Sequence, residues 1–305
     1  MNESRLLRSA LYVPGNNKRF HEKASTLDID ATVLDLEDSV PPDDKETARS
    51  LVREAAKTLA AKGVEVYVRM NAPTSDLGIE DIRLLASANV RGFVVPKVRG
   101  TEDVNLVERT LNSVEEKGKS HRFEILPLIE TAAGVVRSFE IALASPRVVG
   151  LIFGAFDYTF DMGTSWSREG IESSFARQKI PIDARAAGIS AIDTVYPDPN
   201  DEEGFLNDVK VGRRLGYTGK TIIHPKQIAA VNAIFSPTEN ELEWARKVID
   251  AYGPALQRGK GAILLDGSLV DMVHFRRAKD ILKVNDLIRN RQSRPGHGGG
   301  DGSPG

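Results

Sequence analysis

The sequence predicts an α/β protein built as a (β/α)8 TIM barrel with a small C-terminal extension that contains helices and a hairpin. Eight short apolar runs alternate with polar or helical stretches up to residue 223, which is the order of elements in such a barrel. The runs are rich in Val, Ile and Leu and mostly do not alternate with polar residues, as expected of strands covered on both faces. A doubly wound open sheet is the alternative. It is weakened because no Gly-x-Gly-x-x-Gly follows the first run.

Helical signals separate the predicted strands. Asp43 and Glu46 have the spacing of a capping box ahead of an apolar helical face, and similar faces follow Thr101 and Asp201. Each strand therefore leads into a helix, as the barrel requires. The predicted strands are residues 9–13, 31–36, 64–69, 92–95, 123–129, 149–154, 191–196 and 220–223.

After the eighth strand the pattern changes. Ser236 is the predicted N-cap of a helix, with Pro237 in its first turn and Glu239 three residues after the cap. Asp266-Gly267 predicts the turn of a β-hairpin, and a last helix is expected over residues 272–289.

These signals predict three segments. Residues 1–230 form the catalytic barrel and residues 231–291 form the C-terminal extension. Residues 292–305 form a disordered tail, because they are rich in Gly and carry no large apolar side chain.

Composition excludes several classes of protein. The net charge of −2 predicts no nucleic-acid partner and no attraction to an acidic membrane surface. The chain has no Cys, which excludes disulfides, thiolate metal sites and Cys nucleophiles. We find no signal-peptide pattern at the N-terminus and no apolar run of membrane-spanning length, so we expect a soluble cytoplasmic protein.

Two acidic residues stand directly after two successive strands. Glu130 follows the fifth predicted strand and Asp157 follows the sixth, and a parallel barrel brings such strand ends to one mouth. Taken alone, either residue could equally well cap the following helix or form an ion pair instead of binding a metal. Together with Asp35, Glu37 and Asp38 they crowd the mouth with carboxylates, which repel one another unless a cation offsets them. This favours Mg²⁺ on Glu130 and Asp157, with the other three carboxylates in an outer layer around it.

Arg69 at the end of the third strand is the second candidate. It either pairs with Asp35 or Glu37, or its planar fork holds a carboxylate or enolate oxygen of the substrate; we favour the second role. Weaker candidates for substrate or coenzyme A binding are Lys18, Arg19, Pro96, Lys97 and His224. Lys18 and Arg19 could equally well be ordinary solvated surface residues that bind no ligand. For His224 we favour a hydrogen bond to a backbone carbonyl over a catalytic role. By its position before a helix, Asp271 is an N-cap.

Several stretches together resemble the citrate lyase beta-subunit-like family, within the group of HpcH/HpaI aldolases and malyl-CoA and citramalyl-CoA lyases. They occur in order along the chain from about residue 8 to 285. The clearest are LYVPG at 11–15, LDLEDSV at 34–40, VRMN at 68–71, LIET at 128–131, GAFD at 154–157 and IHPKQ at 223–227.

The resemblance implies a (β/α)8 barrel with Mg²⁺, or Mn²⁺, on Glu130 and Asp157 and a 2-oxo acid bound by Arg69. It also implies that the C-terminal segment covers a neighbouring subunit's site in a homo-oligomer, a trimer, where Asp271 is the acid/base. The implied reaction is reversible cleavage of a 3-hydroxyacyl-CoA, such as malyl-CoA or citramalyl-CoA, into acetyl-CoA and a 2-oxo acid. Phe156 departs from the family, which commonly has an acidic residue there. With Tyr158 it makes the mouth more apolar and argues against the citrate lyase substrate.

Other activities fit the same residues. A citrate lyase beta-type citryl lyase, a malyl-CoA thioesterase and a metal aldolase that needs no coenzyme A all belong to the enzyme class. A binding subunit of a larger complex is the non-enzymatic alternative. The retained set of Glu130, Asp157, Arg69 and Asp271 argues against it, because a scaffold does not need these residues.

Overall fold

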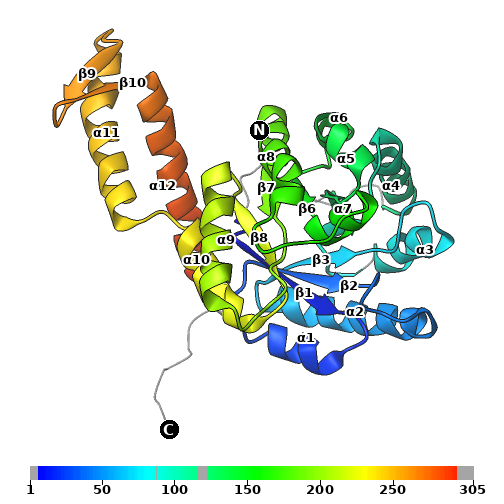
Figure 1. The fold of residues 1–305 in the computed structure, drawn as a ribbon. Coiled ribbons are helices and arrows are strands. Elements are labelled where there is room, and N and C mark those ends of the chain that lie inside the picture. Colours follow the sequence, from blue (N-terminus) through cyan, green and yellow to red (C-terminus); the bar gives the residue numbers. More distant parts are fainter. Residues whose placement is uncertain (1–5, 87, 116–121, 294–305) are drawn as a thin grey trace. The chain divides into compact units, whose positions relative to one another are not determined.

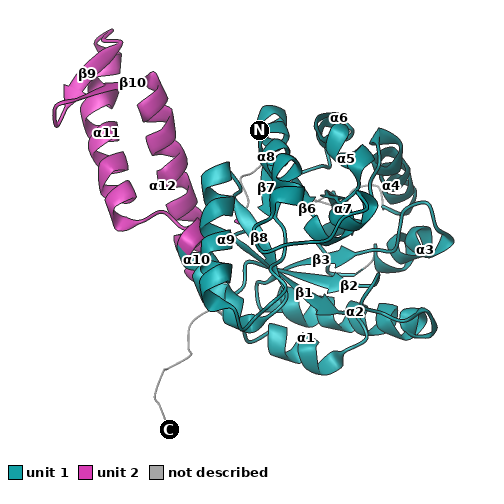
Figure 2. Ribbon diagram, viewed as in Figure 1, with its two compact units in different colours: residues 1–3, 7–233 teal, residues 4–6, 234–305 magenta. Residues whose placement is uncertain are grey.

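The structure is a computed structural model that describes residues 6–86, 88–115 and 122–293. The chain divides into two compact units, one containing Leu7–Ala233 and the other containing the chain from Ile234 on (Figure 2). Most of the predicted tail, from residue 294, lies outside the described residues. Among the described helices, none is both long enough and apolar enough to cross a membrane.

The first unit is a closed barrel of eight parallel strands (Figure 1). The strands pair in sequence order, and β1 pairs with β8 to close the barrel. This confirms the predicted TIM barrel, and the doubly wound alternative is wrong because the sheet has no open edge. The strands are β1 (Ser9–Pro14), β2 (Ala31–Asp35), β3 (Glu65–Arg69), β4 (Gly92–Val95), β5 (Glu124–Ile129), β6 (Gly150–Phe153), β7 (Ser190–Asp193) and β8 (Gly219–Ile222).

Helices connect the strands around the outside of the barrel, as Figure 1 shows. Short 3₁₀ turns, η1 (Pro42–Asp44), η2 (Ile171–Ser173) and η3 (Pro225–Gln227), precede three of them. The helices are α1 (Lys18–Ala24), α2 (Lys45–Ala61), α3 (Asp76–Leu85), α4 (Thr101–Val114), α5 (Ala132–Val136), α6 (Ser138–Leu143), α7 (Ala155–Asp161), α8 (Ser174–Ala187), α9 (Glu202–Leu215) and α10 (Ile228–Phe235).

The barrel interior is packed with side chains from nearly every strand. Burying one aliphatic side chain of this kind contributes about 1.5–3 kcal/mol, so the interior holds the strand ends firmly in place. The one large polar-tipped member, Tyr67, donates its hydroxyl hydrogen to Glu124 Oε2 at 2.7 Å. The cluster comprises Leu7, Ala10, Ala31, Val33, Tyr67, Val94, Leu126, Leu128, Ile152 and Ile192.

Two predicted helix starts are wrong in detail. Pro42 opens a 3₁₀ turn, and α2 begins only at Lys45 with no side-chain cap, so Asp43 and Glu46 form no capping box. Farther along, Thr238 rather than Ser236 caps the helix α11. Its Oγ1 accepts from the Glu241 N–H at 3.2 Å, and Glu241 Oε2 accepts from the Thr238 N–H at 2.8 Å.

The second unit contains α11 (Glu239–Gln257), the hairpin strands β9 (Ala262–Leu265) and β10 (Ser268–Asp271), and α12 (Met272–Gln292). The predicted hairpin is confirmed. Asp266 and Gly267 both have positive φ, 50° and 78°, which is the backbone of a type I′ turn. Its core contains Ala245, Val248, Tyr252, Val270, Phe275 and Ala278.

Candidate active site

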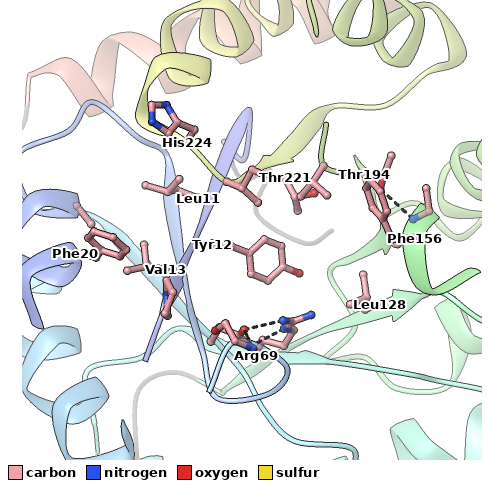
Figure 3. A pocket seen from close by; sticks show the side chains of 18 of the residues that line it. Leu11, Tyr12, Val13, Phe20, Arg69, Leu128, Phe156, Thr194, Thr221 and His224 are labelled. Carbon is pink, nitrogen blue, oxygen red and sulfur yellow. Dashed lines mark hydrogen bonds and ion pairs between the residues drawn. The ribbon is translucent and has the colours of Figure 1, made fainter. Parts of the chain in front are cut away.

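The carboxyl ends of the barrel strands enclose a cavity of about 560 Å³ (Figure 3). This is the end of a parallel barrel at which catalytic sites form. Most of the wall is apolar. Its polar and charged members include Tyr12, Lys23, Asp35, Ser39, Arg69, Glu130, Asp157, Thr194, Thr221 and His224.

Arg69 and Asp35 lie side by side because β2 and β3 pair with these two residues in register. Arg69 donates from Nε to Asp35 Oδ1 and from Nη2 to Asp35 Oδ2, both at 2.7 Å. Its Nη1 is 3.2 Å from Glu37 Oε2, and its guanidinium carbon lies 5.0 Å from the centroid of the Tyr12 ring. Burial alone would raise the pKa of Asp35, but the bonds and charge of Arg69 lower it below its usual value.

Arg69 therefore forms the ion pair with Asp35 that was one of its two predicted roles, because its guanidinium donates two hydrogen bonds to that carboxylate. The guanidinium nevertheless lines the cavity, and a guanidinium has five N–H donors, so some remain beyond those that Asp35 accepts. Binding of a substrate oxygen by these donors stays a prediction.

Lys97 follows β4 and has a left-handed backbone, with φ of 54°, which is uncommon for a residue other than Gly or Asn. This conformation aims its N–H at Glu130 Oε1, at 2.7 Å. Its Nζ lies 2.7 Å from Glu37 Oε1 and 3.3 Å from Asp38 Oδ1. Neither Lys97 nor Pro96 is among the cavity-lining residues, so contact of either with substrate stays a prediction.

Glu130 is 2% exposed and lies just beyond β5. Burial raises the pKa of its carboxyl well above the usual value, and the charges of Asp157 and Glu37 raise it further. The end of β6 approaches closely because residue 154 is Gly: a Cβ there would lie 2.7 Å from Glu130 Oε2. The fold thus brings Glu130 and Asp157, in the first turn of α7, to the same part of the cavity.

This pair of carboxylates fits a divalent cation. Among the described residues no group of three or more His, Cys, Asp or Glu side chains forms a complete metal cage. Mg²⁺ does not need one, since it commonly takes one or two carboxylates and fills its octahedron with water and substrate oxygens. Within the described residues, the Asp157 side chain makes no hydrogen bond or ion pair, so its carboxylate oxygens are available to bind a cation. Its repulsion of Glu130 is what a bound cation would relieve.

The predicted basic residues of α1 lie apart from the cavity. Lys18 lines a separate small pocket with Leu51 and Glu54, and Arg19 is not among the residues lining the main cavity. Lys23 lines the main cavity, and sequence reasoning missed it. A signal was available, because Phe20, Lys23 and Ala24 share one face of α1 and line the cavity together with Leu27, which follows the helix.

His224 lines the cavity at the end of β8. Its Nδ1 accepts a hydrogen bond from the Lys226 N–H at 3.1 Å and caps η3. The expectation of a bond to a backbone carbonyl is wrong, because the ring acts as an acceptor toward the start of the turn. Binding of substrate by His224 stays a prediction.

Asp271 lies in the second unit, where it caps α12, as its position predicted. Its Oδ1 accepts from the Val273 N–H at 2.9 Å and lies 2.7 Å from Nδ1 of His274. The hydrogen bond with His274, followed by the bonds from the helix N–H groups, lowers the pKa of Asp271 below its usual value. The carboxylate is 40% exposed within its own chain. Its role as acid/base stays a prediction.

The two aromatic residues predicted at the mouth lie in different places. Phe156 lines the cavity, as Figure 3 shows. Tyr158 does not line it: the side chain is buried, with its ring edge-on to Phe153 at 5.9 Å between centroids. The prediction that Tyr158 makes the mouth apolar is therefore wrong, and of these two aromatic residues only Phe156 contributes to the apolar wall.

The chain resembles known proteins along most of its length. A family profile described as HpcH/HpaI aldolase/citrate lyase matches residues 8–225, and one described as a carbon–carbon bond lyase of the TIM-barrel fold matches residues 175–283. The chain is 38% identical to citrate lyase subunit beta of Leuconostoc mesenteroides subsp. cremoris, over 93% of this chain and 95% of the relative. It is 32% identical to human mitochondrial citramalyl-CoA lyase, over 93% of this chain and 87% of the relative.

Solved structures agree with this result. The CitE protein of Mycobacterium tuberculosis, in complex with magnesium, acetoacetate and coenzyme A, matches with a TM-score of 0.71 at 28% identity, over 91% of this chain and 98% of that protein. A citrate lyase from Burkholderia xenovorans LB400 matches with a TM-score of 0.78 at 21% identity, which supports the fold alone.

Proposed function

The chain belongs to the HpcH/HpaI aldolase/citrate lyase family and is a carbon–carbon lyase, and from that premise we propose that it is Mg²⁺-dependent and acts on a 3-hydroxyacyl-CoA. The substrate carries a carboxylate on its hydroxyl carbon, as malyl-CoA and citramalyl-CoA do. The products are acetyl-CoA and a 2-oxo acid, glyoxylate or pyruvate. The observation that carries the proposal is the pair of carboxylates, Glu130 and Asp157, beside Arg69 in the cavity at the strand ends.

Glu130 and Asp157 would hold the cation. When bound, Mg²⁺ supplies a Lewis acid for the oxygens of the hydroxyl carbon and its carboxylate. The similar CitE protein of Mycobacterium tuberculosis was solved in complex with magnesium, which supports Mg²⁺ as the cation. The N–H of Lys97 holds one oxygen of Glu130 in place, which keeps the carboxylate oriented.

Arg69 would stabilise negative charge. In the cleavage direction the substrate hydroxyl gives its proton to a solvent water, the bond between the hydroxyl carbon and the thioester α-carbon breaks, and the electron pair of that bond passes to the thioester enolate. The guanidinium donors beyond those bound to Asp35 suit either the enolate oxygen or the carboxylate of the oxo acid. Asp35 and Glu37 fix the guanidinium, so it needs little reorganisation when charge develops.

Asp271 would complete the reaction by protonating the enolate carbon, and in the condensation direction it would remove that proton. Its pKa is lowered, so near neutral pH it is in the ionised form that condensation requires; in the cleavage direction it first takes up a proton from solvent and then gives it to the enolate carbon. We propose that residues 231–291 form an extension that brings Asp271 to the site of a neighbouring subunit in a trimer. The family resemblance of the segment around Asp271 supports this assembly.

Citryl-CoA is the second candidate substrate, because several relatives are beta subunits of citrate lyase at 36–38% identity. Those proteins are named as subunits, so a catalytic subunit of a larger complex is included in this alternative. A thioesterase and an aldolase acting on free acids remain alternatives with the same metal site.

The test is an assay of purified protein with citramalyl-CoA, malyl-CoA and the corresponding free acids, with Mg²⁺ and then with EDTA. The proposed lyase releases acetyl-CoA and an oxo acid only from the thioesters and only with the metal. Release of free coenzyme A with intact hydroxy acid would show a thioesterase. Cleavage of the free acids would show an aldolase, and binding of oxo acid without turnover of any substrate would show a binding subunit.

A further inference from the structure

We propose that Phe156, held by Trp166, is a specificity-determining residue that selects an apolar substituent on the hydroxyl carbon of the substrate. The preferred substituent is methyl, as in citramalyl-CoA, and the rejected one is the carboxymethyl group of citryl-CoA. This inference rests on the proposed function, because it concerns the substrate that the Glu130 and Asp157 site receives.

Phe156 lies next to the predicted metal ligand. It is the second residue of α7 and precedes Asp157, and both side chains line the cavity. An oxo acid held by the cation at Asp157 is therefore near the Phe156 ring. Thr194 lines the same cavity, as labelled in Figure 3, and its Oγ1 accepts a hydrogen bond at 3.0 Å from the N–H of Ala155, the residue before Phe156.

A chain of aromatic contacts holds the Phe156 ring in the wall. Phe156 stacks on Trp166 with 5.4 Å between ring centroids and 21° between ring planes. Trp166 meets Tyr196 edge-on at 6.0 Å, and Tyr196 in turn packs against Phe205 at 6.0 Å. Tyr196 is 3% exposed and donates its hydroxyl hydrogen to Asp201, so the base of the chain is fixed. The Phe156 ring cannot leave the wall without breaking the stack.

Among the described residues that line this side of the cavity, no Lys or Arg side chain is present to pair with a second carboxylate. From β6 to the end of β7 the lining residues are Phe153, Gly154, Ala155, Phe156, Asp157, Thr194 and Val195. Their only charged side chain is Asp157, which the proposed cation would occupy, so none of these side chains can pair with a second carboxylate. Among the lining residues the Lys and Arg side chains are Lys23 on α1 and Arg69 on β3, which belong to other parts of the wall, and the free donors of Arg69 are assigned to the enolate or the oxo-acid carboxylate.

The three candidate substrates differ only in the group that meets this wall. Malyl-CoA carries hydrogen, citramalyl-CoA carries methyl, and citryl-CoA carries carboxymethyl. Replacing hydrogen by a methyl group that packs against an apolar wall raises kcat/KM by roughly 10- to 200-fold. A carboxylate transferred there without a partner loses its hydration and gains no bond in return, so it is rejected.

The experiment measures kcat/KM for all three thioesters with the wild type, Phe156→Arg and Phe160→Arg. Phe160 is the matched control, since it lies on the same helix, is 85% exposed and does not line the cavity. We expect the wild type and Phe160→Arg to favour citramalyl-CoA over citryl-CoA by about 100-fold or more. Phe156→Arg should narrow that ratio at least 10-fold, because it supplies a cation and removes the apolar ring.

Two more variants test the stack and guard against misfolding. Trp166→Phe keeps an aromatic partner and should keep the wild-type ratio, whereas Trp166→Ala should lower it. If Phe156→Arg does not fold, Phe156→Ala carries the test: its preference for citramalyl-CoA over malyl-CoA should fall about 10-fold or more. Turnover of the thioesters with ratios unchanged in every Phe156 variant would overturn the inference and leave the proposed function intact. Absence of turnover of any thioester by the wild type would instead overturn the proposed function.

Discussion

Replacing Arg69 by Lys separates an ion-pair role from a catalytic one. Lys keeps the positive charge but cannot reproduce the two parallel bonds, each 2.7 Å, that the guanidinium donates to Asp35. The pair is nearly buried, with side-chain exposures of 13% for Arg69 and 2% for Asp35, so solvent screens it little. Loss of one hydrogen bond to a charged group costs about 1.5–3 kcal/mol. At about 2–4 °C per kcal/mol, the melting temperature should fall by about 3–12 °C.

A second arginine in the chain provides a matched control. Arg177 donates from Nε to Asp193 Oδ1 at 3.0 Å and from Nη2 to Asp193 Oδ2 at 2.6 Å, and its side chain is also 13% exposed. It does not line the cavity. Arg177→Lys should therefore lose a similar amount of stability while its kcat/KM in the folded protein stays near that of the wild type.

Arg69→Lys should additionally lose about 10²-fold or more in kcat/KM, the usual effect of removing one preorganised donor to developing charge. The assays are thermal melts and steady-state kinetics with the preferred thioester, at a temperature where both variants are folded. If Arg69→Lys and Arg177→Lys lose equal stability and both keep wild-type kcat/KM, Arg69 is only a structural partner of Asp35, and the catalytic reasoning is refuted.

Three further predictions concern the metal site and the second unit. Burial and the charges of Asp157 and Glu37 raise the pKa of Glu130, so the metal-free protein should lose stability as pH rises above 4.5, the usual value for Glu. Glu130→Gln should weaken this pH dependence in thermal melts, and an unchanged curve would contradict the assignment. The pKa of Asp35 is lowered, so its stabilisation is present above its usual value of 3.8 and is lost as pH falls further; Asp35→Asn should reduce acid sensitivity below pH 4 in the same melts. Asp271→Asn should keep Mn²⁺ and pyruvate binding but lose about 10²–10⁴-fold in turnover, and mixing it with Glu130→Gln in equal amounts should restore about a quarter of the sites if subunits share them. No recovered activity in hetero-oligomers verified by mass would exclude shared sites.

Much of the cavity could be predicted because a parallel barrel brings strand ends together. The apolar runs placed Arg69, Glu130 and Asp157 at such ends, and the fold then sets Asp35 in register with Arg69. The hairpin turn was also predictable, because Asp-Gly favours the two positive φ angles that a type I′ turn requires.

Other features depend on tertiary contacts or on a choice between equal local signals. Lys97 gives no sequence signal for its positive φ, which depends on its bonds to Glu130 and Glu37. The contact of Phe156 with Trp166 depends on the course of the chain after α7. Ser236 with Glu239 and Thr238 with Glu241 both fit the capping-box spacing, so spacing alone could not identify the cap.

Direct measurement of metal binding tests the central claim of a cation held by Glu130 and Asp157. Mn²⁺ can be titrated into the wild type, Glu130→Gln and Asp157→Asn with free Mn²⁺ followed by electron paramagnetic resonance, first without and then with pyruvate. The account predicts one site per chain in the wild type, tighter with pyruvate because the oxo acid supplies further oxygen ligands. Both variants should bind at least 10-fold more weakly. Equal Mn²⁺ affinity in the wild type and both variants, each shown to be folded, would contradict it.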